Sequence, residues 1–145
     1  MRFEREVNIK ASPETVHAIM VDIERWPEWT STTVKAKRLD DGPLRTGSKA
    51  VVELVNAPTA TWTVTQVTPA RGFTWESNVR GVHVVGGHDV VAAPDGSRVV
   101  LSVVQTGLMA QIFRPMLARV AKKNLVIEGD GLKAAAERQA GVPAA

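Results

Sequence analysis

The sequence predicts an α+β fold in which one curved antiparallel sheet wraps around a long C-terminal helix. Three observations support this prediction. A short amphipathic helix follows the first strand-like run, turn residues separate a series of strand-like segments, and a helical apolar repeat occupies the last third of the chain. At 145 residues and without cysteine, the chain is expected to form a single domain over residues 1–145 that needs no disulfide.

The first elements are a strand and a well-specified helix. Residues 2–9 alternate between apolar and polar side chains, which is typical of a half-buried strand. Ser12 is a good helix N-cap and Pro13 suits the first helical position. The helix then presents one apolar stripe that needs a core, formed by Val16, Ile19, Met20 and Ile23.

Pro27 is expected to interrupt the helical segment. Proline lacks an N–H donor and disfavours helical geometry in the residue before it, so Trp26 and Trp29 should flank a bend between two short helices. We expect Trp29 to lie near the mouth of a cavity.

Five or six further strand-like runs follow this bend, so six to seven strands are expected in all. The turn segments between them are rich in Gly, Pro, Asn and Asp, and their even spacing favours one antiparallel meander. These segments are residues 40–43, 56–58, 69–72 and 94–96.

Alternation along these runs predicts which residues face inward. Several otherwise apolar inward faces end in a neutral polar residue: Asn56, Gln66 and Gln105. Trp62 and Trp75 fall on the same inward faces. Because a binding pocket needs only a few orienting polar groups, these five residues are candidate ligand contacts.

The segment from Leu108 to about Arg138 has a helical apolar period and predicts one long helix. Pro115 should kink this helix or mark where its regular part begins, and the tail, residues 140–145, is expected to fray. One apolar stripe of the helix is a candidate cavity wall, although plain core packing explains it equally well. Its members are Met109, Phe113, Met116, Leu117 and Val120.

Short motifs along nearly the whole chain carry a family resemblance. They are Ala11–Val16, Asp22–Trp29, Val67–Pro69 with Phe73–Trp75, Gly96–Val99, and Leu132-Lys133 with Glu137. Together they resemble the polyketide cyclase/dehydrase branch of the START/Bet v 1-like (SRPBCC) superfamily. The resemblance implies a helix-grip fold enclosing an apolar cavity, and a ligand that is aromatic, polyketide-like, acyl or lipid.

Two histidines are the first place to look for acid–base chemistry. His83 and His88 lie in one strand-like run, and their odd separation puts them on opposite faces unless Gly86-Gly87 forms a bulge. If that bulge forms, His88 beside Asp89 is a candidate ligand-polarising group. A histidine that only satisfies a hydrogen bond or faces solvent explains the pattern as well, so the catalytic residues stay unknown.

Other reaction classes lack sequence support. The three histidines show no metal-ligand spacing, the Gly86-Gly87 pair is followed by a strand-like run rather than a helix, and no G-x-S-x-G elbow occurs. We therefore expect neither a metal nor a cofactor.

The charge and hydropathy of the sequence indicate which classes of partner to expect. The net charge of +3 is mild, and two basic clusters lack the interleaved aromatics of a nucleic-acid surface, so no nucleic acid is expected. No signal-like or membrane-spanning segment is seen, which predicts a cytoplasmic protein, either monomer or homodimer. The clusters are Lys35, Lys37 and Arg38, and Arg114, Arg119, Lys122 and Lys123.

Three functional hypotheses remain. The first is a protein that binds a small hydrophobic ligand in an internal cavity. The second is a polyketide cyclase/dehydrase-type enzyme with His88 as the first candidate acid or base. The third, weaker hypothesis is a regulatory protein that contacts a partner through the basic face of its long helix.

Overall fold

Residues 1–143 of the computed structural model are described here, and they form one seven-stranded antiparallel sheet with three helices and one 3₁₀ helix. The strand order is β1-β7-β6-β5-β4-β3-β2, so each strand from β2 to β7 pairs with its neighbour in sequence. The predicted α+β fold and antiparallel meander are confirmed. The strands are β1 (Arg2–Ile9), β2 (Thr33–Arg38), β3 (Lys49–Leu54), β4 (Ala60–Thr68), β5 (Gly72–Val79), β6 (Val82–Ala93) and β7 (Gly96–Thr106).

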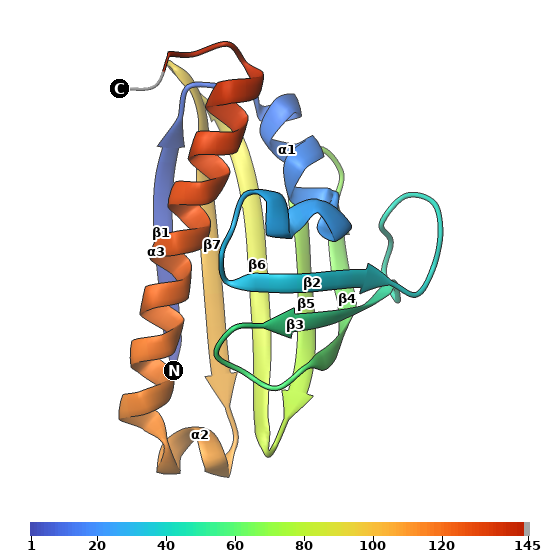
Figure 1. Ribbon diagram of the computed structural model, residues 1–145, viewed down its shortest axis with the longest axis vertical. Coiled ribbons are helices and arrows are strands. Elements are labelled where there is room, and N and C mark those ends of the chain that lie inside the picture. The colour runs from blue at the N-terminus through green and yellow to red at the C-terminus, as the bar shows by residue number, and fades with distance from the viewer. Residues whose placement is uncertain (144–145) are drawn as a thin grey trace.

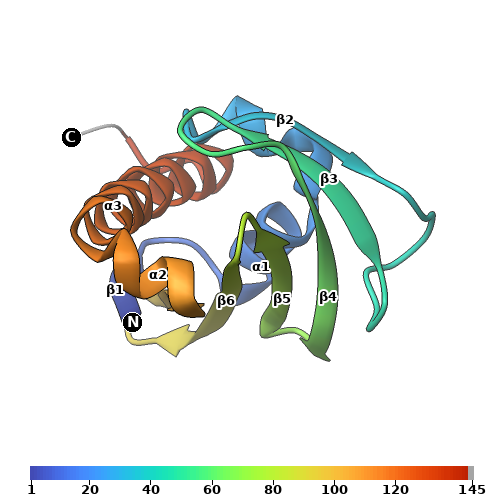
Figure 2. The ribbon, with the colours of Figure 1, turned by 90° about the horizontal axis from the view of Figure 1, so that it is seen from below.

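The sheet curls strongly around its concave face. Figure 1 shows β2 and β3 running across the direction of the other strands, and Figure 2 shows the sheet curving round to face the C-terminal helix. Alternate residues of each strand point into this concave side, as the sequence pattern predicts. Two clusters of buried residues fill part of it, one around Val7, Val99 and Leu132 and one around Trp26 and Trp75.

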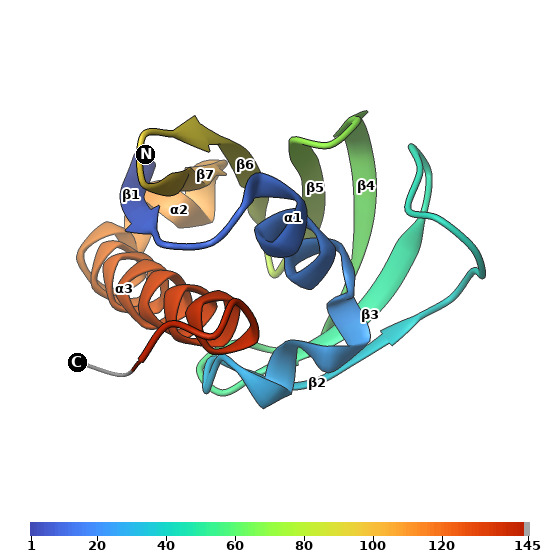
Figure 3. The same cartoon turned by 90° about the horizontal axis from the view of Figure 1, so that it is seen from above.

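Two short helices cross the upper end of the sheet, as predicted (Figure 3). In α1 (Pro13–Val21), the Ser12 hydroxyl accepts a hydrogen bond from the Thr15 N–H at 3.2 Å. The 3₁₀ helix η1 (Ile23–Glu28) follows at once and includes Pro27. The buried Trp26 indole N–H donates to the Met20 carbonyl at 3.0 Å, which fixes η1 against the end of α1.

The C-terminal helix is divided into α2 (Leu108–Ile112) and α3 (Arg114–Gln139). The break falls at Phe113, and Pro115 lies in the first turn of α3, where a missing N–H costs least. Pro115 therefore marks the start of the regular helix, one of the two outcomes expected for it.

Two glycines let α3 approach its neighbours closely. A Cβ on Gly129 would lie 2.9 Å from a methyl of Val7, and one on Gly131 would lie 2.0 Å from the Trp29 carbonyl oxygen. Only residues without a side chain fit at these two positions of the helix.

The end of α3 is capped where fraying is expected to begin. The Val142 N–H donates to the Glu137 carbonyl at 2.8 Å and the Gly141 N–H to the Arg138 carbonyl at 3.1 Å, which is a Schellman motif. Of the tail expected to fray, Ala144 and Ala145 lie outside the described residues.

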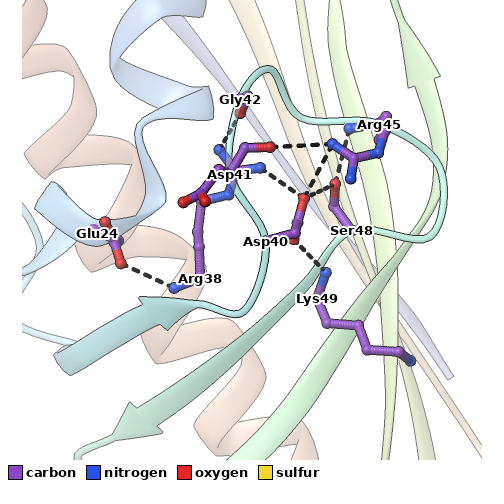
Figure 4. Close-up of polar contacts among 8 residues, drawn as sticks. All are labelled: Glu24, Arg38, Asp40, Asp41, Gly42, Arg45, Ser48 and Lys49. Carbon is purple, nitrogen blue, oxygen red and sulfur yellow. Dashed lines mark hydrogen bonds and ion pairs between the residues drawn. The ribbon is translucent and has the colours of Figure 1, made fainter.

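A polar network holds the connection between β2 and β3 (Figure 4). Asp40 accepts hydrogen bonds from the Ser48 hydroxyl at 2.9 Å and the Lys49 N–H at 3.1 Å, and Arg38 approaches it at 3.0 Å. The hydrogen bond from Ser48 is the main reason that the pKa of Asp40 lies below its ordinary value. Arg38, one member of the first basic cluster, thus forms an ion pair within the connection between β2 and β3.

Candidate functional site

A cavity of about 560 Å³ lies between the concave face of the sheet, α2, α3 and the β3–β4 loop. Its volume falls within the range of small-molecule sites in proteins. Most of its lining is aliphatic or aromatic, and a few of the lining residues are polar. The polar members are Asn56, Arg80, His88, Ser102, Gln105, Asn124 and Glu128.

Aromatic rings form one wall of the cavity. The Trp75 ring centroid lies 5.2 Å from that of Trp26 and 5.3 Å from that of Trp62. Gly86 lies beside this wall, and a Cβ there would come within 3.0 Å of the Trp75 indole nitrogen. The absence of a side chain at Gly86 thus leaves room for the Trp75 ring.

His88 is an uncharged member of this wall. Its ring stacks on Phe73 with centroids 4.3 Å apart, and its Nδ1 lies 3.3 Å from the Phe73 carbonyl oxygen. Burial lowers its pKa from 6.5 to about 4, so the ring is neutral at pH 7. Because a carbonyl oxygen only accepts, Nδ1 carries the proton, and Nε2 keeps a lone pair that can accept a hydrogen bond.

The bulge that would bring both histidines to one face does not form. The pairings of β6 with β5 and β7 run without interruption through Gly86 and Gly87. His83 therefore lies on the convex face, where its Nε2 is 2.9 Å from a Glu76 carboxylate oxygen. His88 alone of the pair lines the cavity.

Glu128, a residue of α3, lies in the cavity wall. The hydroxyl of Thr32, which is fully buried, donates to its Oε1 at 3.2 Å, and the Thr30 hydroxyl lies 2.9 Å from that of Thr32. Burial raises the pKa of Glu128 from 4.5 to about 7, because the charged form loses its hydration. Near neutral pH this carboxyl group can therefore either donate or accept a proton.

A pair of amides joins the β3–β4 loop to α3. The Asn56 side-chain nitrogen donates to Asn124 Oδ1 at 3.0 Å, and Asn124 returns a hydrogen bond of 3.2 Å to Asn56 Oδ1. Both residues line the cavity. This amide pair closes one side of the cavity with two exposed hydrogen bonds.

Gln105 is a buried polar residue near the other end of the cavity. Its side chain lines the cavity although only 7% of the residue is exposed. Its backbone carbonyl accepts from the N-terminal amine of Met1 at 2.7 Å, which fixes the end of β7. Within residues 1–143, its Oε1 has no hydrogen-bond partner.

The structure brings most of the sequence candidates to this one cavity. Lining residues from the strands and the β3–β4 loop are Asn56, Trp62, Trp75, His88 and Gln105, and those from α2 and α3 are Met109, Phe113, Leu117 and Val120.

Gln66 and Trp29 are the two candidates that the structure places elsewhere. The pairing of β4 with β5 shifts by one residue between Val64 and Gln66, so Gln66 is turned to the exposed side of the sheet. Trp29 packs beside α3 and lines a separate hollow of about 260 Å³ that includes Arg25 and Arg138. The residue of this pair that lines the larger cavity is Trp26, which belongs to η1.

Sequence reasoning missed Trp26, Asn124 and Glu128. The last two continue the helical stripe of Val120 at intervals of four residues, a signal that could have found them. Among residues 1–143, no three His, Asp or Glu side chains gather closely enough to hold a metal ion.

The comparisons with known proteins agree with this architecture. The sequence pattern of the family described as "Polyketide cyclase / dehydrase and lipid transport" matches residues 1–137. The chain belongs to this family. A search of curated proteins found no match to the sequence.

Solved structures of low sequence identity share the helix-grip fold of this polyketide cyclase/dehydrase family member. The Zhui aromatase/cyclase from Streptomyces sp. R1128 superposes with a TM-score of 0.79 at 20% identity, covering 99% of both chains. A START superfamily protein from Mycobacterium smegmatis gives 0.77 at 16% identity, covering 95% of this chain and 98% of that one.

The di-domain ARO/CYC StfQ from the steffimycin biosynthetic pathway gives a TM-score of 0.80 at 14% identity. The match covers 97% of this chain and 52% of StfQ, so the family member spans about half the length of that protein. None of the helices in residues 1–143 is both long and apolar enough to cross a membrane.

Proposed function

We propose that this protein binds one small apolar, ring-containing molecule in the cavity between the sheet and α3. The cavity itself carries the proposal, because about 560 Å³ of space lined mainly by apolar side chains is suited to an apolar guest. The cytoplasmic location and the monomeric or homodimeric state expected from the sequence belong to the same proposal.

The side chains of the cavity support a flat ligand. The indoles of Trp26, Trp62 and Trp75 offer ring faces and edges along one wall. A few polar groups at separate points of the wall can orient the ligand. Neutral His88 accepts through Nε2, and Glu128 donates when it is protonated.

Binding can be tested with the uncharged dye N-phenyl-1-naphthylamine and with native mass spectrometry of freshly purified protein. We expect one dye per chain, quenching of tryptophan fluorescence, and displacement of the dye by polycyclic aromatic compounds. Absence of dye binding, together with a mass spectrum that shows no adduct, would contradict the proposal.

A second candidate function is an enzyme that moves a proton on the bound molecule. One observation favours it: the cavity wall holds both a carboxyl group with a pKa of about 7, that of Glu128, and the free Nε2 of neutral His88. Such groups could take a proton from carbon and protonate a carbonyl oxygen of a polyketide-like chain. Among the structural neighbours, Zhui is an aromatase/cyclase and StfQ is a di-domain ARO/CYC.

The enzyme hypothesis requires turnover that depends on these two groups. Conversion of a poly-β-ketone substrate analogue, followed by absorbance of the aromatic product, should be lost in Glu128→Gln while the dye still binds. Replacement of His88 by Phe tests the second group in the same assay. Full turnover in both variants would remove these residues from the mechanism.

A further inference from the structure

An exposed apolar patch lies on α2 and the start of α3, at one end of the molecule. We call it the mouth patch and define it as Leu108, Ile112, Phe113 and Met116. Their exposed fractions are 71%, 58%, 44% and 57%, high values for four large apolar side chains within nine residues. Figures 1 and 2 show α2 at one end of the molecule, beyond the end of β7.

The mouth patch is continuous with the cavity. Phe113 and Met116 line the cavity and are also exposed, so they form part of its rim. Leu108 and Ile112 extend this rim outward on α2. An apolar molecule entering or leaving at this rim would pass over apolar side chains.

Positive charge flanks the mouth patch along the sequence. Residues 108–126 contain four cationic side chains and no Asp or Glu. Among the described residues, none of the four makes an ion pair, and the Lys122 Nζ lies over the Phe3 ring, 5.6 Å from its centroid. The four are Arg114, Arg119, Lys122 and Lys123.

Several arginines elsewhere in the molecule are instead paired with a carboxylate. Arg5, Arg38 and Arg71, for example, each lie within 3.0 Å of a carboxylate oxygen. Four cations without an ion pair among the described residues thus lie within residues 114–123, beside the mouth patch, where they can attract an anionic partner.

We propose that α2 and the first turns of α3 dock onto an anionic membrane surface. The mouth patch enters the boundary between headgroups and acyl chains, and the four cations contact lipid phosphates and carboxylates. Long basic side chains suit this role because their stems cover apolar surface while their charged ends stay hydrated. Docking turns the cavity rim toward the lipid, and it does not depend on whether the cavity is occupied.

Vesicle flotation tests this docking directly. Wild-type protein should float with phosphatidylcholine vesicles containing about 30% phosphatidylserine, and binding should fall steeply with added salt. Pure phosphatidylcholine should retain much less protein. A wild-type protein that fails to bind the anionic vesicles overturns the proposal.

Matched variants distinguish binding through the mouth patch from nonspecific binding by any exposed apolar side chain. Leu108→Ser with Ile112→Ser should reduce bound protein about tenfold or more, because two exposed apolar anchors are lost. The control pair, Val34→Ser in β2 with Leu39→Ser just after it, removes apolar groups of similar exposure, 51% and 57%, and should bind as wild type.

The charge requirement has its own pair of variants. Lys122→Gln with Lys123→Gln should weaken vesicle binding and flatten its salt dependence, whereas Lys35→Gln with Lys37→Gln on β2 should not. Equal binding by both lysine pairs would contradict membrane docking. A dimer seen by light scattering for the wild type, and lost in Leu108→Ser with Ile112→Ser, would contradict it as well. Urea unfolding of each variant checks that the fold is intact.

Discussion

Two groups in the cavity wall give the stability of the protein opposite dependences on pH. Burial raises the pKa of Glu128 from 4.5 to about 7, so the folded chain keeps a proton that the unfolded chain releases. The free energy of unfolding therefore falls as pH rises from 4.5 to about 7. The pKa difference corresponds to a loss of about 3 kcal/mol that persists above this range.

His88 acts in the other direction. In the folded chain, its pKa of about 4 lies below the ordinary 6.5. Between these two pH values, the unfolded chain is therefore protonated at His88 and the folded chain is not. The free energy of unfolding falls as pH drops from 6.5 to about 4, again by about 3 kcal/mol. Between pH 4.5 and 6.5 the two contributions oppose each other in the wild-type protein.

The Glu128→Gln variant removes one of these titrations and keeps the size of the side chain and an oxygen for the Thr32 hydroxyl. At pH 8 we expect the variant to be more stable than wild type by up to about 3 kcal/mol, and this advantage should vanish near pH 4.5. Urea denaturation followed by circular dichroism across this pH range measures the difference.

Two further variants serve as controls for this reasoning. His88→Phe keeps a ring stacked on Phe73, and its stability relative to wild type should rise on acidification below pH 6.5. Glu137→Gln should instead lose stability relative to wild type at neutral pH, because the Lys10 N–H and Lys133 lower the pKa of Glu137. A difference between Glu128→Gln and wild type that does not change with pH would refute the burial of this carboxyl group.

Three other substitutions test the packing around the cavity. Asn124→Ala removes both hydrogen bonds to Asn56, so a bound dye should dissociate severalfold faster in stopped-flow measurements, and an unchanged rate would show that the amide pair is no barrier. Gly131→Ala places a Cβ 2.0 Å from the Trp29 carbonyl oxygen and should cost about 2–4 kcal/mol in urea unfolding, whereas a stabilised variant would contradict this contact. Leu132→Ala empties a position that is 1% exposed and should cost about 3 kcal/mol, measured by the same unfolding assay; a loss below about 1 kcal/mol would be inconsistent with a packed core there.

The alternation of apolar residues was sufficient to predict the strands and most of their inward faces. Trp62, Trp75 and Gln105 line the cavity because period-two patterning fixes the face of a strand when one side is buried. The same rule failed at Gln66. The pairing of β4 with β5 shifts by one residue after Val64, and the alternation of residue types gives no sign of this shift.

Helical and long-range features were harder to predict. The stripe of Leu117 and Val120 indicated a cavity wall, but its polar continuation at Glu128 looked like an ordinary solvated residue of an amphipathic helix. Only the folded chain shows that Thr32, 96 residues away in sequence, meets this carboxyl group. Trp26, rather than Trp29, lines the larger cavity, and Pro27 lies inside η1 instead of ending the helical segment.

Neighbouring valines of β6 provide the most direct test of ligand binding in the cavity. Val84 lines the cavity, whereas Val85 lies on the convex face opposite Glu76 and Val104. We predict that Val84→Trp fills the cavity and abolishes binding of N-phenyl-1-naphthylamine, while Val85→Trp binds the dye as wild type does. Unchanged affinity in a folded Val84→Trp protein would contradict the cavity as the binding site.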